Sequence, residues 1–247
     1  MIESSASSVH ASAWSTGNAV EFYRSQRRKR TELYASETEF FGELLDGAAS
    51  ILDVGCAAGG FAGIVREYAP QILYSGADIS PAMIAEARHR FPKNPFHLVD
   101  GTTLPFEDRE FDAVVCFGVL HMTEDWSGLL EECWRVCRSS FLFDVRLVEG
   151  EGINDGALSY QKIEFGGVWD GVSTVPYLIQ NVDAFISGLR GMDPQPHRIR
   201  NYGYIHPVSS MTMSPYKEVC MATFLLDKVG EPAEMEWRLP LKLKEMT

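Results

Sequence analysis

The sequence predicts an α/β fold in which helices cover both faces of a mostly parallel β-sheet. Short apolar runs that read as buried strands alternate with segments of helical periodicity from residue 51 to residue 147. One of these runs, 113–116, is apolar without interruption, as is typical of a strand buried on both faces. Residues that start and end helices fall between the runs, which is the pattern of a parallel sheet with helical crossovers.

The expected strands come in two groups. Five strands are predicted at 51–54, 72–77, 96–99, 111–117 and 141–147. Two later strands, at 199–205 and 218–226, are separated by a turn-rich stretch and are expected to pair antiparallel at a sheet edge.

The expected helices carry clear local signals. Ser80 caps a helix whose first residue is Pro81, a position that needs no N–H donor, and Pro92 ends it. Apolar residues recur at helical spacing over 126–137, which predicts a helix with one buried face. Further helices are expected after residue 60 and over 182–189.

The chain is expected to have three parts. Residues 1–46 form an N-terminal helical segment, with helix over 18–46; residues 47–227 form the main domain; and residues 228–247 form a C-terminal tail without a predicted place. Within the main domain, the glycine-rich stretch 149–176 reads as an inserted hairpin that covers a substrate. The basic run Arg24, Arg27, Arg28, Lys29 and Arg30 is either a solvated helix face or part of a lid whose arginines meet a carboxylate or phosphate.

Composition limits the classes of partner. The 247 residues include 22 basic and 34 acidic side chains, a formal net charge of −12, which acts against nucleic acid and anionic membranes as main partners. The N-terminus does not resemble a signal peptide, and no run reaches the ~18 apolar residues of a membrane span. The five cysteines lack disulfide or metal-ligand spacing, so we expect reduced thiols, no metal site and a cytoplasmic location.

The glycine-rich turn after the first strand predicts a ligand site. Gly55, Gly59 and Gly60 lack a Cβ, so the backbone can approach a ligand closely where the strand ends. One interpretation is a dinucleotide turn, G-x-G-x-x-G, with Ala57 in place of the middle glycine. The other is S-adenosylmethionine (SAM), because the carboxylate of Asp53 suits an ammonium and a sulfonium better than a pyrophosphate. A structural turn that binds nothing is the third.

Carboxylates also follow the second and third strands. Asp78 can accept hydrogen bonds from both ribose hydroxyls of either NAD or SAM. Asp100 can accept from the adenine amino group, while backbone N–H groups of Gly101 and Thr102 meet the ring nitrogens. Phe117 and Gly118 end the fourth strand, beside the reacting end of such a ligand. Asp53, Asp78 and Asp100 lie near the carboxyl ends of successive strands and therefore along one edge of the sheet, which we call the rim. Three carboxylates on this rim indicate an adenosine ligand with a positively charged tail.

Four blocks, 53–59, 76–83, 100–106 and 111–121, resemble the class I SAM-dependent methyltransferase family in order and spacing. The resemblance covers roughly residues 50–145. It implies a Rossmann-like sheet of seven strands with the last strand antiparallel, SAM as cofactor and S-adenosylhomocysteine as product. The implied contacts are Asp53, Gly55, Cys56, Ala57 and Gly59 for the methionine part, Asp78 for the ribose, Ile79 and Met83 for the adenosine, and Asp100, Gly101 and Thr102 for the adenine. Ala57 stands where the family usually has glycine, so the turn should be tighter around the ligand.

The predicted reaction is methyl transfer to an oxygen or nitrogen atom of a small-molecule acceptor, by in-line displacement at the sulfonium methyl. His121 is the first candidate for a general base, and a histidine hydrogen-bonded for structure is the alternative. Arg146 could hold an anionic substrate group or form an ordinary ion pair. Tyr160 and Tyr177, with Trp169 and His206, lie in the region expected to build the acceptor pocket. The other functional hypotheses are an NAD-dependent oxidoreductase and a SAM-binding protein without catalysis.

Overall fold

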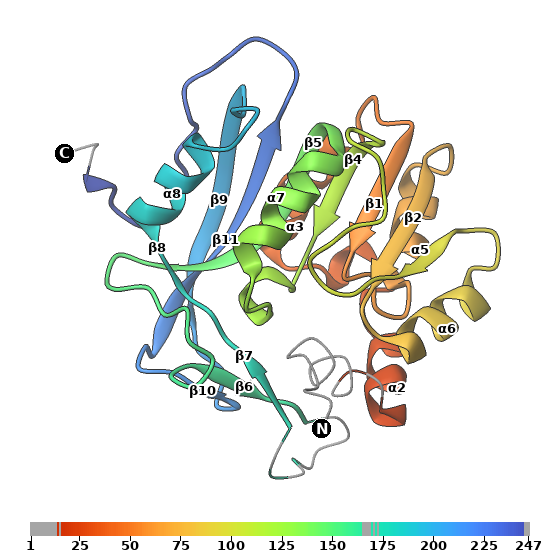
Figure 1. Cartoon of the computed structure of the whole chain (residues 1–247), viewed down its shortest axis with the longest axis horizontal. Helices are drawn as coiled ribbons and strands as arrows, with labels where there is room; N and C mark the ends of the chain where they lie inside the picture. Colours follow the sequence, from red (N-terminus) through yellow and green to blue (C-terminus); the bar gives the residue numbers. More distant parts are fainter. Residues whose placement is uncertain (1–13, 15, 165–168, 170, 172, 245–247) are drawn as a thin grey trace, which may run out of the picture.

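The computed structural model describes residues 14, 16–164, 169, 171 and 173–244. A central sheet runs through the described chain in the order β3-β2-β1-β4-β5-β11-β9, and a short strand, β8, also pairs with β5 (Figure 1). The strands are β1 (Ser50–Val54), β2 (Leu73–Asp78), β3 (Phe96–Leu98), β4 (Phe111–Cys116), β5 (Cys137–Val148), β8 (Gln180–Asn181), β9 (Arg198–Pro207) and β11 (Glu218–Asp227).

Strand direction confirms the predicted topology. Strands β1 to β5 pair in parallel, whereas β11 pairs antiparallel with both β5 and β9. The last strand therefore runs against the other six strands of this path, as the family resemblance implied. The register places Val54 of β1 beside Ala77 of β2, so the residues that follow these two strands leave the sheet at the same level.

Helices cover both faces of the sheet, as predicted. Helices α7 (Trp126–Val136) and α8 (Val182–Arg190) pack on one face, and Figure 1 shows α7 in front of the central strands. Helices α4 (Phe41–Leu45), α5 (Gly60–Tyr68) and α6 (Pro81–Arg90) pack on the other face. In β4, Val114 belongs to the first core and Val115 to the second, which explains the uninterrupted apolar run.

Local capping follows the sequence signals. The Ser80 side chain accepts a hydrogen bond from the N–H of Met83, and Pro81 is the first residue of α6. Asp125 caps α7 in the same way, by accepting from the N–H of Gly128. Helix α7 ends one residue before the predicted end, because Cys137 already begins β5.

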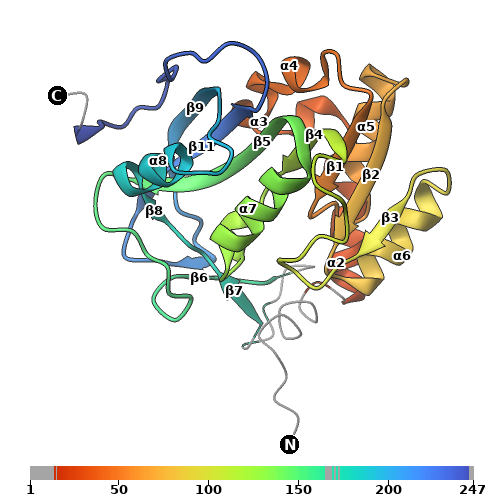
Figure 2. The ribbon, with the colours of Figure 1, turned by 45° about the horizontal axis from the view of Figure 1, so that its top comes forward.

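The helical segment predicted over 18–46 is made of several short helices. The segment consists of α2 (Gly17–Ser25), a 3₁₀ turn, η1 (Arg30–Glu32), α3 (Ala35–Glu39) and α4, which Figure 2 shows from above. Helix α2 ends at Ser25, Gln26 is extended, and Arg27 adopts the left-handed region at φ 51°, so the helix does not continue. Beyond α2, side-chain carboxylates accept hydrogen bonds from backbone N–H groups: Glu32 accepts from the N–H of Arg28, and Glu37 accepts from the N–H of Tyr34.

The insertion at 149–176 contains the expected hairpin. Strands β6 (Tyr160–Lys162) and β7 (Thr174–Pro176) pair antiparallel, while residues 165–168, 170 and 172 lie outside the described chain. The sequence did not indicate the third strand of this small sheet, β10 (Thr212–Met213), which comes from the turn-rich stretch between β9 and β11. The small sheet lies beyond one end of the central sheet in Figure 1.

The C-terminal tail, which the sequence did not place, packs on the end of the central sheet. Leu239 and Leu243 are buried in the core under α7 and α8. The N–H of Glu236 donates to the carbonyl of Ile199 in β9. Within the described part of the chain, no helix combines the length and apolar character that crossing a membrane requires.

Candidate active site

The turn between β1 and α5 is fixed by its own geometry. Gly55 has φ 80°, and a Cβ at this position would lie 2.2 Å from Cγ2 of Val119, so no other residue fits. The N–H groups of Gly55 and Cys56 donate to the carbonyl of Ala77, at 2.8 and 3.1 Å. Gly59, at φ 77°, leads into α5. The turn is therefore held against the end of β2.

Asp78 at the end of β2 is linked to this turn. Its Oδ2 accepts from the N–H of Ala57 at 2.9 Å, and its Oδ1 accepts from the N–H of Ser80 at 2.8 Å. Burial raises the pKa of Asp78, and these backbone donors oppose that shift. Each oxygen keeps a further lone pair for an outside donor. Ala57 has φ 44°, so the residue that replaces the family's usual glycine occupies a left-handed conformation.

Asp53 is buried directly before the turn. Its side chain is 5% exposed, and its Oδ2 accepts from the hydroxyl of Tyr74 at 2.6 Å. Burial raises the pKa of Asp53 to about 7, although the hydrogen bond from Tyr74 and the charge of Arg27 lower it. The carboxyl group is thus poised between its two protonation states near neutral pH. A nearby cation would favour the charged state.

The other predicted cofactor residues lie on the same rim. The N–H of Val99 donates to the carbonyl of Asp78, which sets the stretch 100–102 beside the end of β2. Gly118 is the second residue after β4; it adopts φ 73° and donates its N–H to Asp144 at 2.5 Å. Cys56 and Met83 are buried, whereas Ile79 is partly exposed. The structure therefore brings the acidic strand ends and the glycine turn together.

Helix α2 packs over this rim. Its Ala19 forms a buried cluster with Ala58 of the turn and Met83 of α6, with Tyr23 packed against them. Burial raises the pKa of Tyr23 to about 12; Arg27 opposes this shift, and the negative charge of Asp78 adds to it. Figure 1 shows α2 beside α6. The N-terminal segment thus covers the predicted adenosine end of the site.

Arg27 follows α2 in the N-terminal segment, residues 16–46, which we call the covering segment. Its side chain reaches from this segment into the site. Its Nη2 lies 2.7 Å from Oε1 of Glu37, and its guanidinium carbon lies 5.7 Å from the ring centroid of Phe117. The Glu37 side chain is 1% exposed. The rest of the basic run stays outside: Arg24, for example, pairs with Glu86 on the surface. Arg24 thus fits the solvated face, whereas Arg27 points inward, and its contact with a ligand stays a prediction.

A second ion pair lies at the end of β5. Asp144 is buried and accepts from Nη1 of Arg146 at 2.6 Å; burial lowers the pKa of Arg146, but Asp144 and Tyr177 raise it above its usual value. Sequence reasoning named Arg146 and Tyr177 but missed Asp144 and Glu37. The available signal for Asp144 was that Asp144 and Arg146 are two charged residues inside the otherwise apolar predicted strand 141–147.

His121 lies next to this pair. It belongs to the short turn η2 (Leu120–Met122), is 5% exposed, and contacts the Tyr177 ring with centroids 5.4 Å apart. Within the described residues its buried Nδ1 has no hydrogen-bond partner. Burial, assisted by the charge of Arg146, lowers the pKa of His121 to about 3. The imidazole is therefore neutral near pH 7, and its role as a base stays a prediction.

The remaining predicted acceptor residues are not part of this network. Tyr160 lies half-buried in β6, opposite Pro176 of β7. Trp169 has the ammonium of Lys162 4.6 Å from its ring centroid. His206 is exposed in β9. These residues belong to the small sheet and its surroundings rather than to the rim itself.

The buried neutral His121 predicts a dependence of stability on pH. An unfolded histidine gains a proton below pH 6.5, whereas the folded one does so only near pH 3. Stability is therefore fully present above the unfolded pKa and falls as pH drops, by about 2 kcal/mol at pH 5 from this group alone. Urea unfolding of wild type and of His121→Asn at neutral and acidic pH should show a smaller loss in the variant. Equal losses would contradict the neutral, buried assignment.

Comparison with known proteins finds similarity to methyltransferases. Residues 52–142 match the family model described as a methyltransferase domain. The chain is 32% identical over 94 residues to a ubiquinone/menaquinone biosynthesis C-methyltransferase of Desulfotalea psychrophila, covering 37% of this chain and 38% of that protein. It is 36% identical over 90 residues to a demethylmenaquinone methyltransferase of Deinococcus radiodurans, covering 35% and 37%. The matches thus span less than two fifths of these relatives.

Solved structures show the same fold over a longer stretch. A SAM-dependent methyltransferase from Methanosarcina mazei has a TM-score of 0.54 and 18% identity, covering 81% of this chain and 99% of that one. The N-terminal domain of EvdMO1 with SAH bound has a TM-score of 0.51 and 18% identity, covering 76% and 77%. The range matched by the family model, 52–142, includes Asp53, Asp78 and the glycine turn. Through residues 52–142 the chain is thus similar to methyltransferases, and its fold is shared with SAM-dependent methyltransferases.

Proposed function

We propose that the protein transfers a methyl group from SAM to an oxygen or nitrogen atom of a small-molecule acceptor. The observation that carries the proposal is the buried carboxyl of Asp53, placed before a glycine turn and beside the acidic end of β2. A buried acid at that point suits the ammonium of SAM and opposes a pyrophosphate. The matched methyltransferase domain supports the same reading.

In this proposal, different residues bind the amino-acid end and the ribose of SAM. Asp53 and the turn at 55–59 hold the amino-acid end, and Asp78 holds the ribose. Arg27, beside Phe117, offers a guanidinium to the carboxylate of the same amino-acid end. SAM, when bound, supplies a methyl group already activated on a sulfonium. The protein therefore needs mainly to position the acceptor and exclude water.

The segment at the N-terminus and the inserted hairpin serve as covers in this proposal. Helix α2 packs on Met83 and Ala58, so it closes the adenosine end. The hairpin of β6 and β7 leads directly into Tyr177, whose ring lies against His121. The acceptor then lies between Tyr177 and the rim, where Arg146 and Asp144 fix one wall. The free thiols of all five cysteines support the cytoplasmic location that we propose.

Binding of S-adenosylhomocysteine should depend on the ionisation of Asp53. With its pKa at about 7 in the free protein, Asp53 must lose a proton to pair with the ligand ammonium. Affinity should therefore rise between about pH 6 and 8, with proton release on binding. Calorimetric titration at several pH values, in buffers of different ionisation enthalpy, measures both the affinity and the number of protons released. Tyr74→Phe removes a donor to the charged form, so the rise should move to higher pH. Affinity that ignores pH would contradict the assignment.

Turnover tests the activity itself. Purified protein is incubated with methyl-labelled SAM and a panel of phenols, amines, carboxylic acids and quinols, and the labelled products are identified by mass spectrometry. The proposal expects a labelled product that depends on Asp78. A protein that binds the cofactor and methylates no acceptor in a broad panel would favour the non-catalytic alternative.

Carbon methylation is the second candidate. The relative from Desulfotalea psychrophila carries the name C-methyltransferase, and the chain matches it over 94 residues. NMR of the labelled methyl group in the product separates the cases, because methyl groups on oxygen, nitrogen and carbon differ widely in chemical shift. A methyl on carbon would overturn the proposed acceptor atom and leave the cofactor unchanged.

A further inference from the structure

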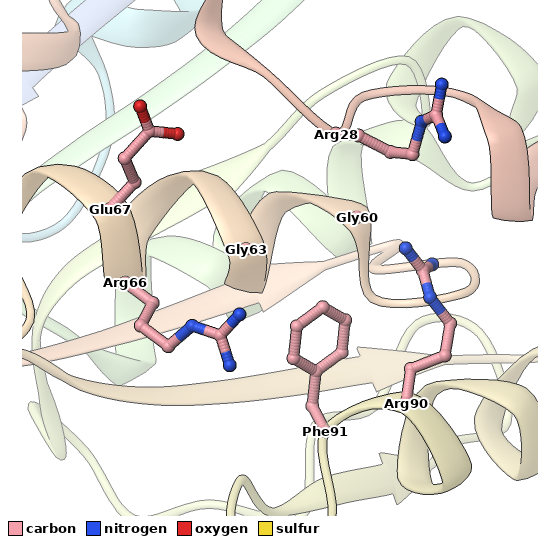
Figure 3. Close-up of a pocket in the computed structure, with 7 residues that line it drawn as sticks. All are labelled: Arg28, Gly60, Gly63, Arg66, Glu67, Arg90 and Phe91. Atoms are coloured by element: carbon pink, nitrogen blue, oxygen red, sulfur yellow. The ribbon is translucent and has the colours of Figure 1, made fainter.

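A pocket of about 430 Å³ lies outside the rim, between α5, the end of α6 and the covering segment. Three arginines line it, Arg28 from the segment, Arg66 from α5 and Arg90 from α6, and we call it the arginine pocket. Figure 3 shows their side chains around a common space, with Phe91 between Arg66 and Arg90. Gly63 of α5 lines the same space and leaves the helix backbone accessible.

Two of the arginines are held in place by the pocket itself. The guanidinium carbons of Arg66 and Arg90 lie 5.5 and 5.2 Å from the ring centroid of Phe91. Nη1 of Arg90 also donates to the carbonyl of Ala58 at 2.6 Å. Stacking on a ring leaves the N–H groups at the guanidinium edge free to donate to a ligand. These two arginines are therefore preorganised for an anion.

The charge of the pocket is not balanced from within. Glu67 is the one acidic residue that lines it. In the described part of the chain, no ion pair engages the side chains of Arg28, Arg66 or Arg90, while nearby Arg24 is taken up by Glu86 at 2.8 Å. Burial lowers the pKa of Arg90; Glu86 opposes this shift, and the charges of Arg24 and Arg28 add to it. A concentrated positive site thus exists on a protein of net charge −12.

We propose that the arginine pocket binds a small phosphorylated molecule through its phosphoryl oxygens. Guanidinium groups form parallel hydrogen bonds with such oxygens, and a phosphoryl group can serve several arginines at once. The pocket is larger than one phosphoryl group, so it has room for the rest of a small ligand. The acidic protein disfavours a long polyanion such as nucleic acid, which would extend beyond the pocket.

Such a ligand would hold the covering segment on the core. Gly60, at the start of α5, lies directly under the segment, because a Cβ there would lie 2.7 Å from the carbonyl oxygen of Arg27. Arg28 is the next residue, so an anion that joins it to Arg66 and Arg90 fixes the segment that carries Arg27 into the site. This regulatory consequence rests on the proposed function, whereas the binding itself does not.

The test uses pyrophosphate as probe and the full chain, titrated by calorimetry without any cofactor. Arg66→Gln should weaken binding about tenfold or more, since hydrogen bonds to charged groups are the strong ones. The matched control is Lys93→Gln, which removes one exposed charge close by but outside the pocket. Thermal unfolding confirms that both variants fold. No binding by wild type, or equal weakening in the control, would overturn the proposal.

Further experiments distinguish a small phosphorylated ligand from a membrane lipid. They also distinguish failure of the arginine-pocket proposal from failure of the proposed methyltransferase function. Vesicles containing phosphatidic acid that bind in an Arg66-dependent way, without pyrophosphate binding, would overturn the small-molecule ligand in favour of a membrane lipid. Pyrophosphate should also slow trypsin cleavage after Lys29 in wild type and not in Arg66→Gln; unchanged cleavage in wild type overturns the effect on the segment. If the wild-type protein binds pyrophosphate and does not bind S-adenosylhomocysteine, the result counts against the proposed function and not against the arginine-pocket proposal.

Discussion

Replacing Asp78 with alanine is expected to weaken binding of S-adenosylhomocysteine at least about a hundredfold. In the proposed site, the variant loses two hydrogen bonds from ribose hydroxyls to a charged carboxylate, together about 3–6 kcal/mol. The variant also removes the acceptor of the N–H groups of Ala57 and Ser80, which fixes the glycine turn. Calorimetric titration of wild type and variant measures the change directly.

Two further variants make the Asp78 result interpretable. Glu131→Ala removes one exposed carboxylate from α7 and should leave affinity unchanged. Asp78→Asn keeps the shape and one acceptor oxygen, so its affinity should fall between those of wild type and Asp78→Ala. Wild-type affinity in Asp78→Ala, with the fold intact, would remove Asp78 from the cofactor site and with it the assignment of the whole rim.

Replacing Arg27 with leucine should destabilise the protein by about 3–5 kcal/mol, because it leaves the buried carboxylate of Glu37 without its partner. Glu37 is 1% exposed and lies 2.7 Å from the Arg27 guanidinium. The double variant Arg27→Leu/Glu37→Gln removes both charges and should recover much of the loss. Urea unfolding at one fixed pH compares the three proteins.

The surface offers a matched control for this prediction. Arg24 precedes Arg27 by three residues and pairs with Glu86, but its own side chain is 50% exposed. Exposed ion pairs contribute about 0–1 kcal/mol, so Arg24→Leu should change the free energy of unfolding by no more than that. Equal effects of the two single variants would show that Arg27 does not act as a buried ion-pair partner.

The central fold was predictable because its signals are local. Strand burial on two faces appears directly as the apolar run 113–116 that ends β4, and Ser80 with Pro81 marks the start of α6. Chain order then leads to a parallel sheet, since strands alternate with helices. The rim followed from the same logic. Asp53 and Asp78 end neighbouring parallel strands, so they must meet at one edge.

The rest of the site depends on contacts between distant segments. Nothing near Arg27 in sequence distinguishes it from Arg24; its inward direction comes from a left-handed backbone and from Glu37, ten residues later. Asp144 looked like a strand residue, and its partners are Gly118 and Arg146. The short strand β10 forms only because β6 supplies its hydrogen-bonding edge. Such tertiary pairings leave no periodic pattern in the sequence.

The most direct test of the central claim is a parallel calorimetric titration of the full chain with S-adenosylhomocysteine and with NAD. We expect that S-adenosylhomocysteine binds and that NAD does not, because the buried Asp53 and the acidic rim favour a cationic amino-acid end over a pyrophosphate. Binding of NAD without binding of S-adenosylhomocysteine would contradict the account and make the turn at Gly55 a dinucleotide site.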